Sequence, residues 1–370
     1  MKSTIIFYGP FPKKNRVGGY ERCNSAIVTS FLTEYYDFIP LKIYSIPLSG
    51  SWKVLFYPLS FFLGCLVDSL KLIYLIKRKK PTIIHITSLY KWHIFREWII
   101  VNISLFFNIK VLFDIRAGRF DTLYYKTNFI FKFFTKNIIK NSFSITVEGK
   151  RYIDFIQKEF IRTAYYLPNF INTTDSKVSP RDYCKNDICK LFFAGRIVRE
   201  KGIEELLLGL EGVVPKFNIK LLLAGSIENT YKEYLFNKFP VLFKEGIIVF
   251  LGVLDLDQLL KEMRDSDIFL LPSKHKGEGH SNAVNEAMYA GLPLIVSNQG
   301  FLSDLVTLET GIVIDEVNAK NIENAIISIC SDKKLLKNMG EKSRKMVIEN
   351  YSDSVVLGSL KEIYRKIIVG

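Results

Sequence analysis

The stretch IFLLPSKHKGEGHSNAVNEAMYAGLP, from Ile268 to Pro293, combines an apolar run, a glycine-containing loop and a short helical segment. The run Ile268 to Leu271 predicts a buried strand that ends at Pro272, because proline cannot continue a central strand. A helix is expected to begin near Ser281 or Asn282, since either residue suits an N-cap, and to end at the following glycine. In a parallel α/β sheet, this order places free backbone N–H groups just past the carboxyl end of a strand, where phosphates bind.

Two carboxylates flank the predicted helix start. Glu278 lies in the loop and Glu286 lies about one turn inside the helix, with seven residues between them. Because carboxylates accept hydrogen bonds from ribose and sugar hydroxyls, the pattern predicts a site for a nucleotide that carries a sugar. For this stretch alone, an acidic first turn favoured by the helix dipole remains an open alternative.

The composition indicates a two-domain globular protein whose positive charge is concentrated in one half. Two domains are expected at 370 residues, and 48% hydrophobic with 14% aromatic content excludes a disordered chain. The net charge is +14; residues 1–172 contain 25 Lys and Arg against 10 Asp and Glu, and the remainder contains 26 against 27. We expect the first half to face a membrane surface, a nucleic acid or a phosphate-bearing substrate; solubility alone is the alternative.

The cysteines and the N-terminus indicate a reducing, cytoplasmic location. The five cysteines are odd in number and include no Cys-x-x-Cys pair, so neither a disulfide framework nor a zinc site is expected. The chain runs directly into a predicted strand, Ser3 to Tyr8, so no signal peptide is expected.

One segment of the first half is apolar enough to raise the question of a membrane. Val54 to Ile76 is interrupted by Pro58, Asp68 and Lys71, which leaves fewer than the roughly 18–20 apolar residues needed to cross. The run Lys77 to Lys80 then supplies four cations. We therefore expect peripheral attachment to the anionic inner face of the cytoplasmic membrane, with a core helix that carries a basic end as the alternative.

Apolar runs alternate with helical stretches in both halves, which predicts two parallel sheets covered by helices. The expected strands are Thr4 to Tyr8, Ile83 to Ile86, Lys110 to Phe113, Ser144 to Thr146, Ala164 to Leu167, Lys190 to Ala194, Lys220 to Ala224, Ile247 to Phe250, Ile268 to Leu271, Leu294 to Val296 and Ile312 to Ile314. The polar stretch Thr173 to Asp187 predicts a linker, and Ser352 to Ile367 predicts a final amphipathic helix.

Two groups of residues in the first half are candidates for ligand contact. Gly18 and Gly19 precede a helix predicted from Tyr20 to Thr33 and allow close backbone approach, although any tight turn uses such a pair. The segment from Asp114 to Arg119 follows a strand, so its two arginines and carboxylate are expected at the ligand end of the sheet. An internal Asp–Arg pair is the alternative.

Cations of the second half are expected to meet a diphosphate. Arg196 and Lys201 lie in the loop after the strand Lys190 to Ala194, where fixed positive charge would stabilise a departing phosphate. A solvated charged loop is the alternative. No metal site is expected: the two Asp-x-Asp triplets, at 255–257 and 265–267, resemble a helix N-cap and a helix end, and the histidines lack ligand spacing.

Together these residues resemble the retaining glycosyltransferases of family 4, which have the GT-B fold. The most specific part is the Glu-x7-Glu element, here Glu278 to Glu286. Supporting parts are Gly195-Arg196…Glu200-Lys201-Gly202, Gly18-Gly19-Tyr20-Glu21, Pro168-Asn169 and the returning C-terminal helix. The resemblance implies two Rossmann-like parallel-sheet domains that face a central cleft. Residues 1–172 would form the acceptor side, 173–350 the nucleotide-sugar side, and 351–370 a helix that returns to the first domain.

The resemblance also implies roles for individual residues. Arg196 and Lys201 would bind the donor diphosphate, Glu286 the ribose and Glu278 the donor sugar. Further donor contacts are implied for Gly18, Gly19, Val253, Leu254, Gly279, His280, Ser281 and Asn282. Many members carry a histidine after the strand that matches Lys110 to Phe113, but this chain reads Asp114-Ile115-Arg116-Ala117-Gly118. Asp114, Arg116 or Arg119 is expected to replace that histidine, so the implied catalytic set is Glu278, Arg196, Lys201, Asp114 and Arg116.

The implied function is transfer of a sugar, with retained configuration, from a nucleoside diphosphate to a polyprenyl- or lipid-linked saccharide during cell-surface polysaccharide synthesis. No cofactor or metal is expected. Nucleic acid is not an expected partner, because the chain has no recognition motif for it. Two alternatives remain: a sugar-nucleotide epimerase of the same fold, and a non-catalytic, membrane-bound partner that binds a nucleotide sugar.

Overall fold

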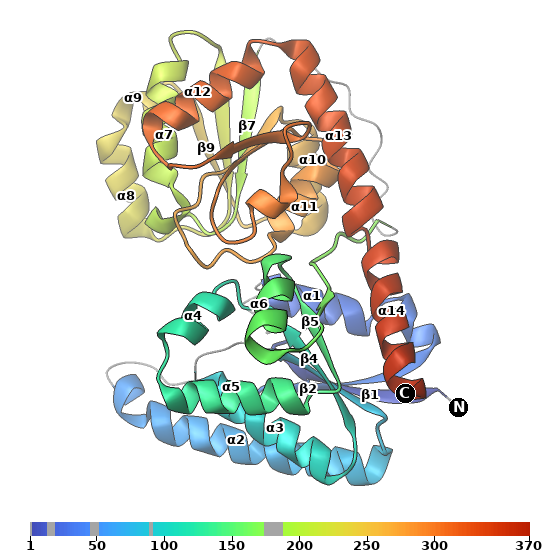
Figure 1. Cartoon of the computed structure of the whole chain (residues 1–370). Helices are drawn as coiled ribbons and strands as arrows, with labels where there is room; N and C mark the ends of the chain where they lie inside the picture. The colour runs from blue at the N-terminus through green and yellow to red at the C-terminus, as the bar shows by residue number, and fades with distance from the viewer. Residues whose placement is uncertain (1, 13–18, 45–51, 89–91, 174–187) are drawn as a thin grey trace. The chain divides into compact units, whose positions relative to one another are not determined.

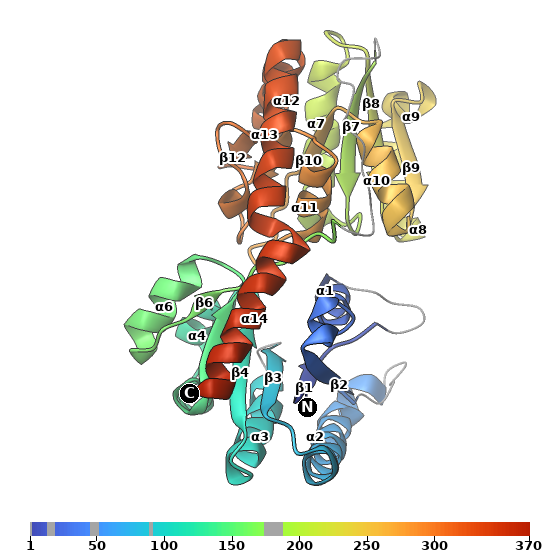
Figure 2. The same cartoon turned by 90° about the vertical axis from the view of Figure 1, so that its right-hand side faces the viewer.

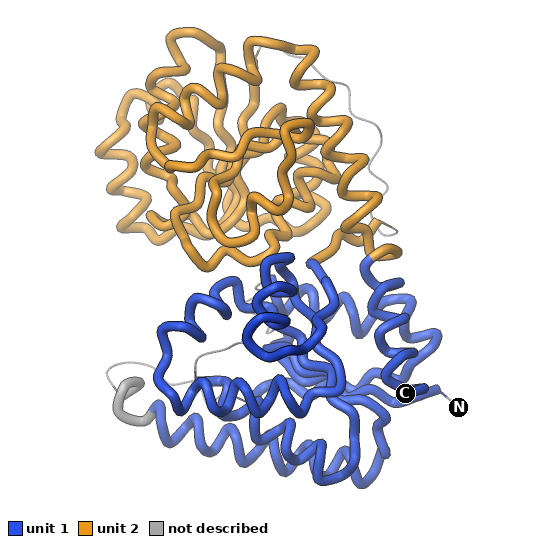
Figure 3. Tube along the Cα trace, in the orientation of Figure 1, with its two compact units in different colours: residues 1–168, 356–370 blue, residues 169–355 orange. Residues whose placement is uncertain are grey.

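The computed structural model describes residues 2–12, 19–44, 52–88, 92–173 and 188–370, apart from the side chains of 52–56. The chain forms two units, residues 1–168 with 356–370 (unit 1) and residues 169–355 (unit 2), which Figure 3 distinguishes by colour. The chain therefore leaves unit 1 after Pro168 and returns to it at Val356, whereas the sequence placed these boundaries at 172/173 and 350/351. Of the linker predicted from Thr173 to Asp187, residues 174–187 lie outside the described residues, as does Gly18.

Unit 1 is built on a six-stranded parallel sheet with the order β2-β1-β3-β4-β5-β6. Its strands are β1 (Ser3–Gly9), β2 (Tyr36–Lys42), β3 (Ile83–Ser88), β4 (Lys110–Ile115), β5 (Ser144–Val147) and β6 (Tyr165–Tyr166). The sequence predicted all of these except β2. That strand lies at the edge of the sheet beside β1 and is partly exposed, so it lacks a continuous apolar run and tolerates Pro40.

The helices of unit 1 are α1 (Gly19–Val28), α2 (Trp52–Lys79), α3 (His93–Phe106), α4 (Phe120–Lys126), α5 (Phe129–Asn141), α6 (Arg151–Phe160) and most of α14 (Asp353–Val369), with a 3-10 turn at Phe31–Glu34. The helix expected from Tyr20 to Thr33 is therefore too long. Ser30 ends it, because its hydroxyl accepts the Leu32 N–H at 3.2 Å and begins the 3-10 turn.

Neighbouring residues of β1 show which helices cover which face of the sheet. Side chains alternate along a strand, so Phe7 and Tyr8 point to opposite faces. Tyr8 donates its hydroxyl hydrogen to Asp68 of α2 at 2.8 Å. The Phe7 ring lies against His85, whose Nδ1 is 2.6 Å from the Tyr364 hydroxyl of α14. The layer that contains α2 and α3 thus covers one face and α14 covers the other, as Figures 1 and 2 show.

Unit 2 contains a second six-stranded parallel sheet, with the order β12-β11-β10-β7-β8-β9. Its strands are β7 (Cys189–Ala194), β8 (Ile219–Ala224), β9 (Ile248–Gly252), β10 (Ile268–Leu271), β11 (Leu294–Ser297) and β12 (Gly311–Ile314). Its helices are α7 (Ile203–Val213), α8 (Asn229–Lys238), α9 (Pro240–Lys244), α10 (Leu256–Arg264), α11 (Asn282–Tyr289), α12 (Ala319–Cys330) and α13 (Lys333–Tyr351), with 3-10 turns at Arg199–Lys201 and Ser303–Leu305. All six predicted strands are confirmed. The inner strands β10 and β11 are fully buried apolar runs, whereas the edge strands β9 and β12 are partly exposed.

Helix α2 is longer and more apolar than the sequence reading allowed. Among the described helices it is the one with the length and composition to cross a membrane, over Tyr57–Lys79, with a mean hydropathy of 1.9. Pro58 lies in the early turns and does not end the helix. Asp68 does not end it either, because its carboxylate is buried and accepts hydrogen bonds from Tyr8, at 2.8 Å, and from the Tyr44 N–H, at 3.0 Å.

A buried charged cluster joins β3, β4 and α14. Arg116 donates from Nε to Asp114 Oδ2 at 2.6 Å, and Thr146 donates to the other carboxylate oxygen at 2.8 Å. Burial alone would raise the pKa of Asp114, but Arg116 and His85 outweigh it and hold that pKa at about 2. Burial lowers the pKa of His85, which faces both Asp114 and Tyr364.

Histidine burial predicts a loss of stability in mild acid. Burial also lowers the pKa of His93, to about 4. Below about pH 6.5 the unfolded chain binds more protons at these imidazoles than the native chain does. The free energy of unfolding should therefore fall by up to about 1.4 kcal/mol per pH unit for each histidine. In urea unfolding between about pH 7 and pH 5, His93→Gln should reduce this slope, whereas His275→Gln, at an exposed position, should not. An equal slope in wild type and His93→Gln would contradict the expectation.

Candidate functional site

The carboxylate of Glu278, in the loop after β10, is held from two sides within unit 2. Lys201 donates a hydrogen bond to its Oε1, and the Ser273 hydroxyl donates to the same oxygen at 2.5 Å. Glu278 is 8% exposed, and its Oε2 accepts no hydrogen bond within the described part of the chain. The group is therefore fixed in position by one oxygen and keeps a second acceptor for a hydroxyl of a bound molecule.

Close backbone packing brings Lys201 to this loop. Gly202 follows the 3-10 turn with φ +72°, and a Cβ there would lie 1.9 Å from the Pro272 carbonyl oxygen. The Lys274 N–H donates to the Glu200 carbonyl at 2.7 Å. Only glycine permits this approach, so the loops after β7 and β10 are fixed together at the carboxyl edge of the sheet. That edge is where parallel α/β sheets bind ligands.

The loop after β11 packs against the backbone carbonyl of Glu278. Gly300 has φ +61°, and a Cβ there would lie 1.9 Å from the Glu278 carbonyl oxygen. The Phe301 N–H donates to that oxygen at 3.1 Å. The Ser297 hydroxyl also donates to the Ser273 carbonyl at 2.6 Å, which orients the serine that holds Glu278. Sequence reasoning missed Ser297 and Gly300, because each acts on a residue of another loop. It also missed Ser273, which acts on Glu278 within the same loop.

Helix α11 begins as the sequence predicted. Ser281 is its N-cap, and its hydroxyl accepts the Val284 N–H at 3.4 Å. Asn169 fixes the chain on either side of this cap: its Nδ2 donates to the His280 carbonyl at 2.6 Å, and its own carbonyl accepts from Asn285 Nδ2 at 3.1 Å. The helix N-terminus, with the N–H groups that suit an anion, is thereby held at the same edge as Glu278.

Three adjacent strands end in glycines at this edge. Gly195 follows β7, Gly225 follows β8 and Gly252 ends β9, with φ values of +146°, +145° and +72°. A Cβ at Gly225 would lie 1.8 Å from the Gly195 carbonyl oxygen. The backbones of Gly195 and Gly225 are therefore closely packed. The next residue after β9, Val253, is 76% exposed. The sequence reading named Val253 and Leu254 but missed Gly225.

The other residues of unit 2 that were predicted to contact the donor differ in their exposure. Glu286 is 3% exposed inside α11, and His280 is buried with its ring edge-on to Tyr351 at 4.9 Å. Arg196 is exposed and makes no ion pair with a described residue. Gly279 and Asn282 are half-buried beside the α11 N-cap. The structure thus brings together Lys201 and Glu278 directly, whereas Arg196 projects into solvent.

The predicted positions of Asp114 and Arg116 require a correction. Asp114 lies within β4 rather than after it, and both side chains are fully buried in the ion pair described above. The internal pair that the sequence reading left open is therefore what the structure contains. Gly19 is the first residue of α1 in the same unit.

Neither Asp-x-Asp triplet forms a cluster of carboxylates that could bind a metal ion. Asp255 is the N-cap of α10 and forms a capping box with Gln258, as the sequence indicated. Asp265 follows α10, and Asp267 accepts the Lys190 N–H at 2.8 Å. Across the described ranges, no three His, Cys, Asp or Glu side chains are placed to share a metal ion.

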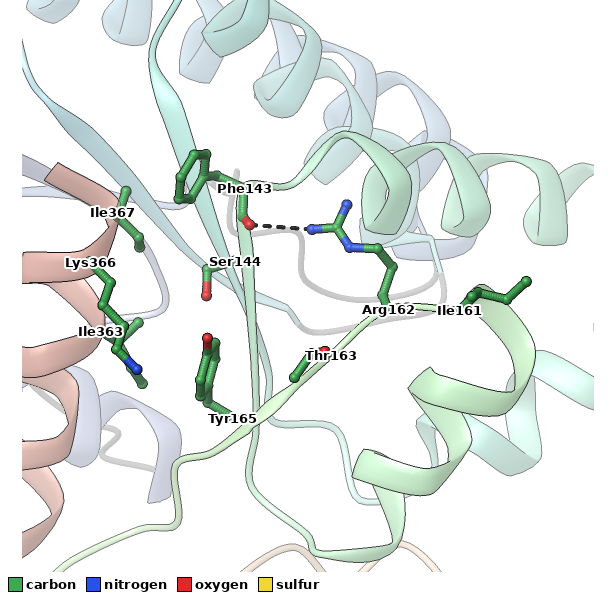
Figure 4. Close-up of a pocket in the computed structure, with 9 residues that line it drawn as sticks. All are labelled: Phe143, Ser144, Ile161, Arg162, Thr163, Tyr165, Ile363, Lys366 and Ile367. Atoms are coloured by element: carbon green, nitrogen blue, oxygen red, sulfur yellow. Dashed lines mark hydrogen bonds between the residues drawn. The ribbon is translucent and has the colours of Figure 1, made fainter. Parts of the chain in front are cut away.

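Unit 1 contains a separate pocket of about 330 Å³, drawn in Figure 4. Its walls include Ser144, Tyr165 and Lys366, and Arg162 beside it donates to the Ser142 and Phe143 carbonyls at 2.7 and 3.2 Å. Ser144 is the first residue of β5, so the pocket lies at the amino end of that strand. Ligands of parallel sheets bind at the opposite end, which makes this pocket a poor candidate for a nucleotide site.

The sequence similarity to a known protein family lies in the second half of the chain. Residues 185–346 match the family described as "Glycosyl transferases group 1". Over 185 residues the chain is 30% identical to the capsular polysaccharide biosynthesis glycosyltransferase CapM of Staphylococcus aureus, an alignment that covers 48% of this chain and 46% of CapM. The chain spans about half the length of the curated relatives it matches. Residues 185–346 are therefore similar in sequence to group 1 glycosyl transferase domains.

Solved structures resemble the whole chain. Sucrose-phosphate synthase from Thermosynechococcus elongatus has a TM-score of 0.78 at 16% identity, and the match covers 100% of both chains. Anabaena HepE in complex with UDP-glucose has a TM-score of 0.71 at 15% identity, with 98% of this chain and 99% of that chain covered. These likenesses, with the two six-stranded parallel sheets, identify the fold as GT-B.

Paired glycine substitutions test whether the loop after β11 positions Glu278. Gly246→Ala changes a glycine with φ +68° and open space around it, so only backbone strain of about 1–2 kcal/mol is expected. Gly300→Ala adds a collision with Glu278 and should lower the free energy of unfolding by about 1–3 kcal/mol more. Thermal unfolding and calorimetric titration with UDP check this. Equal effects of the two substitutions would show that Gly300 does not support the Glu278 loop.

Proposed function

We propose that the chain is a retaining glycosyltransferase of family 4, Glu-x7-Glu type, that uses a nucleoside-diphosphate sugar as donor. The observation that carries this proposal is the fixed Glu278–Lys201 pair beside the N-terminus of α11, inside a group 1 glycosyl transferase domain. A carboxylate, a cation and a helix N-terminus match the hydroxyls and the diphosphate of such a donor. Structures of HepE with UDP and with UDP-glucose support a nucleotide sugar as the donor class.

In this proposal the residues of unit 2 divide the donor among them. Lys201, with Arg196 and the α11 N-terminus near Asn282, takes the diphosphate. Glu286 accepts from the ribose and Glu278 from the donor sugar. Backbone groups at Val253 and Leu254 lie beside the base, and Gly279, His280 and Ser281 complete the phosphate loop.

The proposed chemistry is a front-face substitution. The bond from the anomeric carbon to the phosphate oxygen breaks, and the acceptor oxygen forms the new bond on the same face. The departing phosphate takes the acceptor proton, so no enzyme nucleophile is used. Lys201 and Arg196 stabilise the charge that grows on the leaving diphosphate, and we propose that no metal ion is required.

We propose a polyprenyl- or lipid-linked saccharide as the acceptor, in the synthesis of a cell-surface polysaccharide. The likeness to CapM supports a polysaccharide product, and the basic first half supports an acceptor at an anionic surface. The protein would then lie in the cytoplasm, peripheral on the inner face of the cytoplasmic membrane, where the donor is available.

Replacement of Lys201 or of Glu286 should reduce turnover much more than replacement of a charged residue outside the proposed donor contacts. Lys201→Ala and Glu286→Ala are each expected to lower kcat/KM by about 100-fold or more, because they remove stabilisation of the leaving group or of the ribose. Lys274→Ala is the matched control: it removes a neighbouring Lys–Glu pair, with Glu205, that is exposed and outside the proposed contacts. Steady-state transfer assays give the values. Near-normal turnover in both single variants would refute the assigned roles.

A donor and acceptor screen by mass spectrometry identifies the reaction class. Formation of a glycosylated lipid-linked acceptor is the expected result. Interconversion of free nucleotide sugars without an acceptor would instead indicate an epimerase. Tight binding of a nucleotide sugar without turnover in the presence of every acceptor would indicate a non-catalytic partner.

A further inference from the structure

The outward side of α2 is apolar although it is not packed against the rest of unit 1. Leu59, Phe62, Leu66 and Leu70 recur every three or four residues and are between 56% and 70% exposed. The opposite side of the helix carries the buried residues, such as Leu72. A helix of a soluble domain normally places polar residues on its outer stripe, so this outer stripe needs a partner.

Neighbouring helices extend the same surface. Helix α3 packs between α2 and α5, and the three form one layer on a single face of the unit 1 sheet (Figure 1). Phe129 and Phe133 on α5 are 79% and 60% exposed, and Phe106 at the end of α3 is 80% exposed. These rings lie in a layer with the exposed leucines of α2, so the apolar surface extends beyond a single helix.

The charge of this layer is entirely of one sign at the surface. The helices α2, α3 and α5 contain two acidic residues, Asp68 and Glu97, and both are buried. Asp68 lies against Arg96, and Glu97 accepts from the Ser88 hydroxyl at 2.8 Å. Exposed cations are frequent, at Lys71, Lys77, Arg78, Lys79, Lys136 and Lys140. The surface therefore combines apolar side chains with positive charge and no exposed carboxylate of its own.

We propose that this surface, the outer side of α2, α3 and α5, is the docking surface for an anionic lipid bilayer. The exposed leucine and phenylalanine side chains enter the headgroup boundary, and the lysines and Arg78 meet the lipid phosphates. The absence of any exposed acidic residue in these helices favours an anionic surface over a protein of mixed charge. This inference deepens the proposed peripheral localisation and rests on it, but it adds which face of unit 1 meets the lipid.

The layer lies on the membrane and does not cross it. Although α2 has the length and composition to span, its inner side is committed to unit 1. Asp68 of α2 accepts the Tyr8 hydroxyl of β1 and lies 3.4 Å from Arg96 of α3. Insertion of α2 would break these contacts and expose the carboxylate to lipid, which is costly.

Flotation of the full chain with lipid vesicles tests the apolar part of the surface. Wild type should float with vesicles of phosphatidylcholine mixed with phosphatidylglycerol and much less with phosphatidylcholine alone. The variant Phe62→Gln/Leu66→Gln/Leu70→Gln should bind the mixed vesicles at least about 100-fold more weakly. The control Val241→Gln/Leu308→Gln/Ile348→Gln removes three exposed apolar side chains from unit 2 and should float as wild type does. Equal flotation of the two variants would overturn the proposal.

A charge reversal tests the electrostatic part. Lys136→Glu/Lys140→Glu on α5 should weaken binding to the mixed vesicles by at least about 30-fold, because two cations are lost from the surface. Lys244→Glu/Lys334→Glu makes the same change in charge on exposed residues of unit 2 and is the matched control. An equal loss in both variants would mean that net charge, and not this surface, drives binding, which would overturn the assignment.

Two further measurements distinguish docking on the membrane surface from insertion into the membrane and from self-association of the chain. Bound protein should be released by alkaline carbonate; retention would show insertion and contradict the surface arrangement. Light scattering without vesicles should show the same mass for wild type and the apolar variant. A dimer that only the apolar variant abolishes would assign the surface to a second copy of the chain.

Donor binding, measured by calorimetry with UDP in the absence of lipid, keeps this inference distinct from the proposed function. Loss of flotation with intact UDP binding would concern the surface alone. Flotation by a chain that neither binds UDP nor transfers sugar would leave the surface in place and refute the function.

Discussion

The hydrogen bonds that Lys201 and Ser273 donate to one oxygen of Glu278 fix the centre of the candidate site. A carboxylate next to a diphosphate site would repel its ligand unless a fixed cation compensated its charge. Lys201 can supply that cation because Gly202 lets its loop touch Pro272, at the end of the neighbouring strand. The loops after β7, β10 and β11 are therefore packed closely together. Gly202 lies where the first loop touches the second, Gly300 lies where the third touches the second, and neither position has room for a Cβ.

Unit 1 uses the same residue types for a different purpose. Asp114 with Arg116, and Asp68 with Arg96, are buried pairs that also receive hydrogen bonds from Thr146 and Tyr8. Buried ion pairs contribute little net stability, but a missing partner is costly, so they specify one arrangement of the elements that carry them. Here they fix β4 near α14 through His85, and they hold the inner side of α2 against β1 and α3.

Helix α2 links the packing of unit 1 to its surroundings. Its inner side carries Cys65, Leu72 and Ile76 into the core, and its outer side is also apolar. Core packing explains only the inner side. The outer leucines, which lie beside a row of lysines, are the basis of the proposed docking to an anionic lipid surface.

The sequence by itself determined the alternation of strands and helices, a helix start at Ser281 or Asn282 and the common sheet edge of Lys201 and Glu278. These follow from local periodicity, from capping chemistry and from the rule that parallel strands end on one side. The tertiary structure alone decided the burial of Asp114 and Arg116, the edge strand β2, and the support of Glu278 by Ser273 and Gly300. It also decided which side of α2 is covered. The physical reason is that periodicity reports which residues of an element share a face, whereas only packing decides what covers that face.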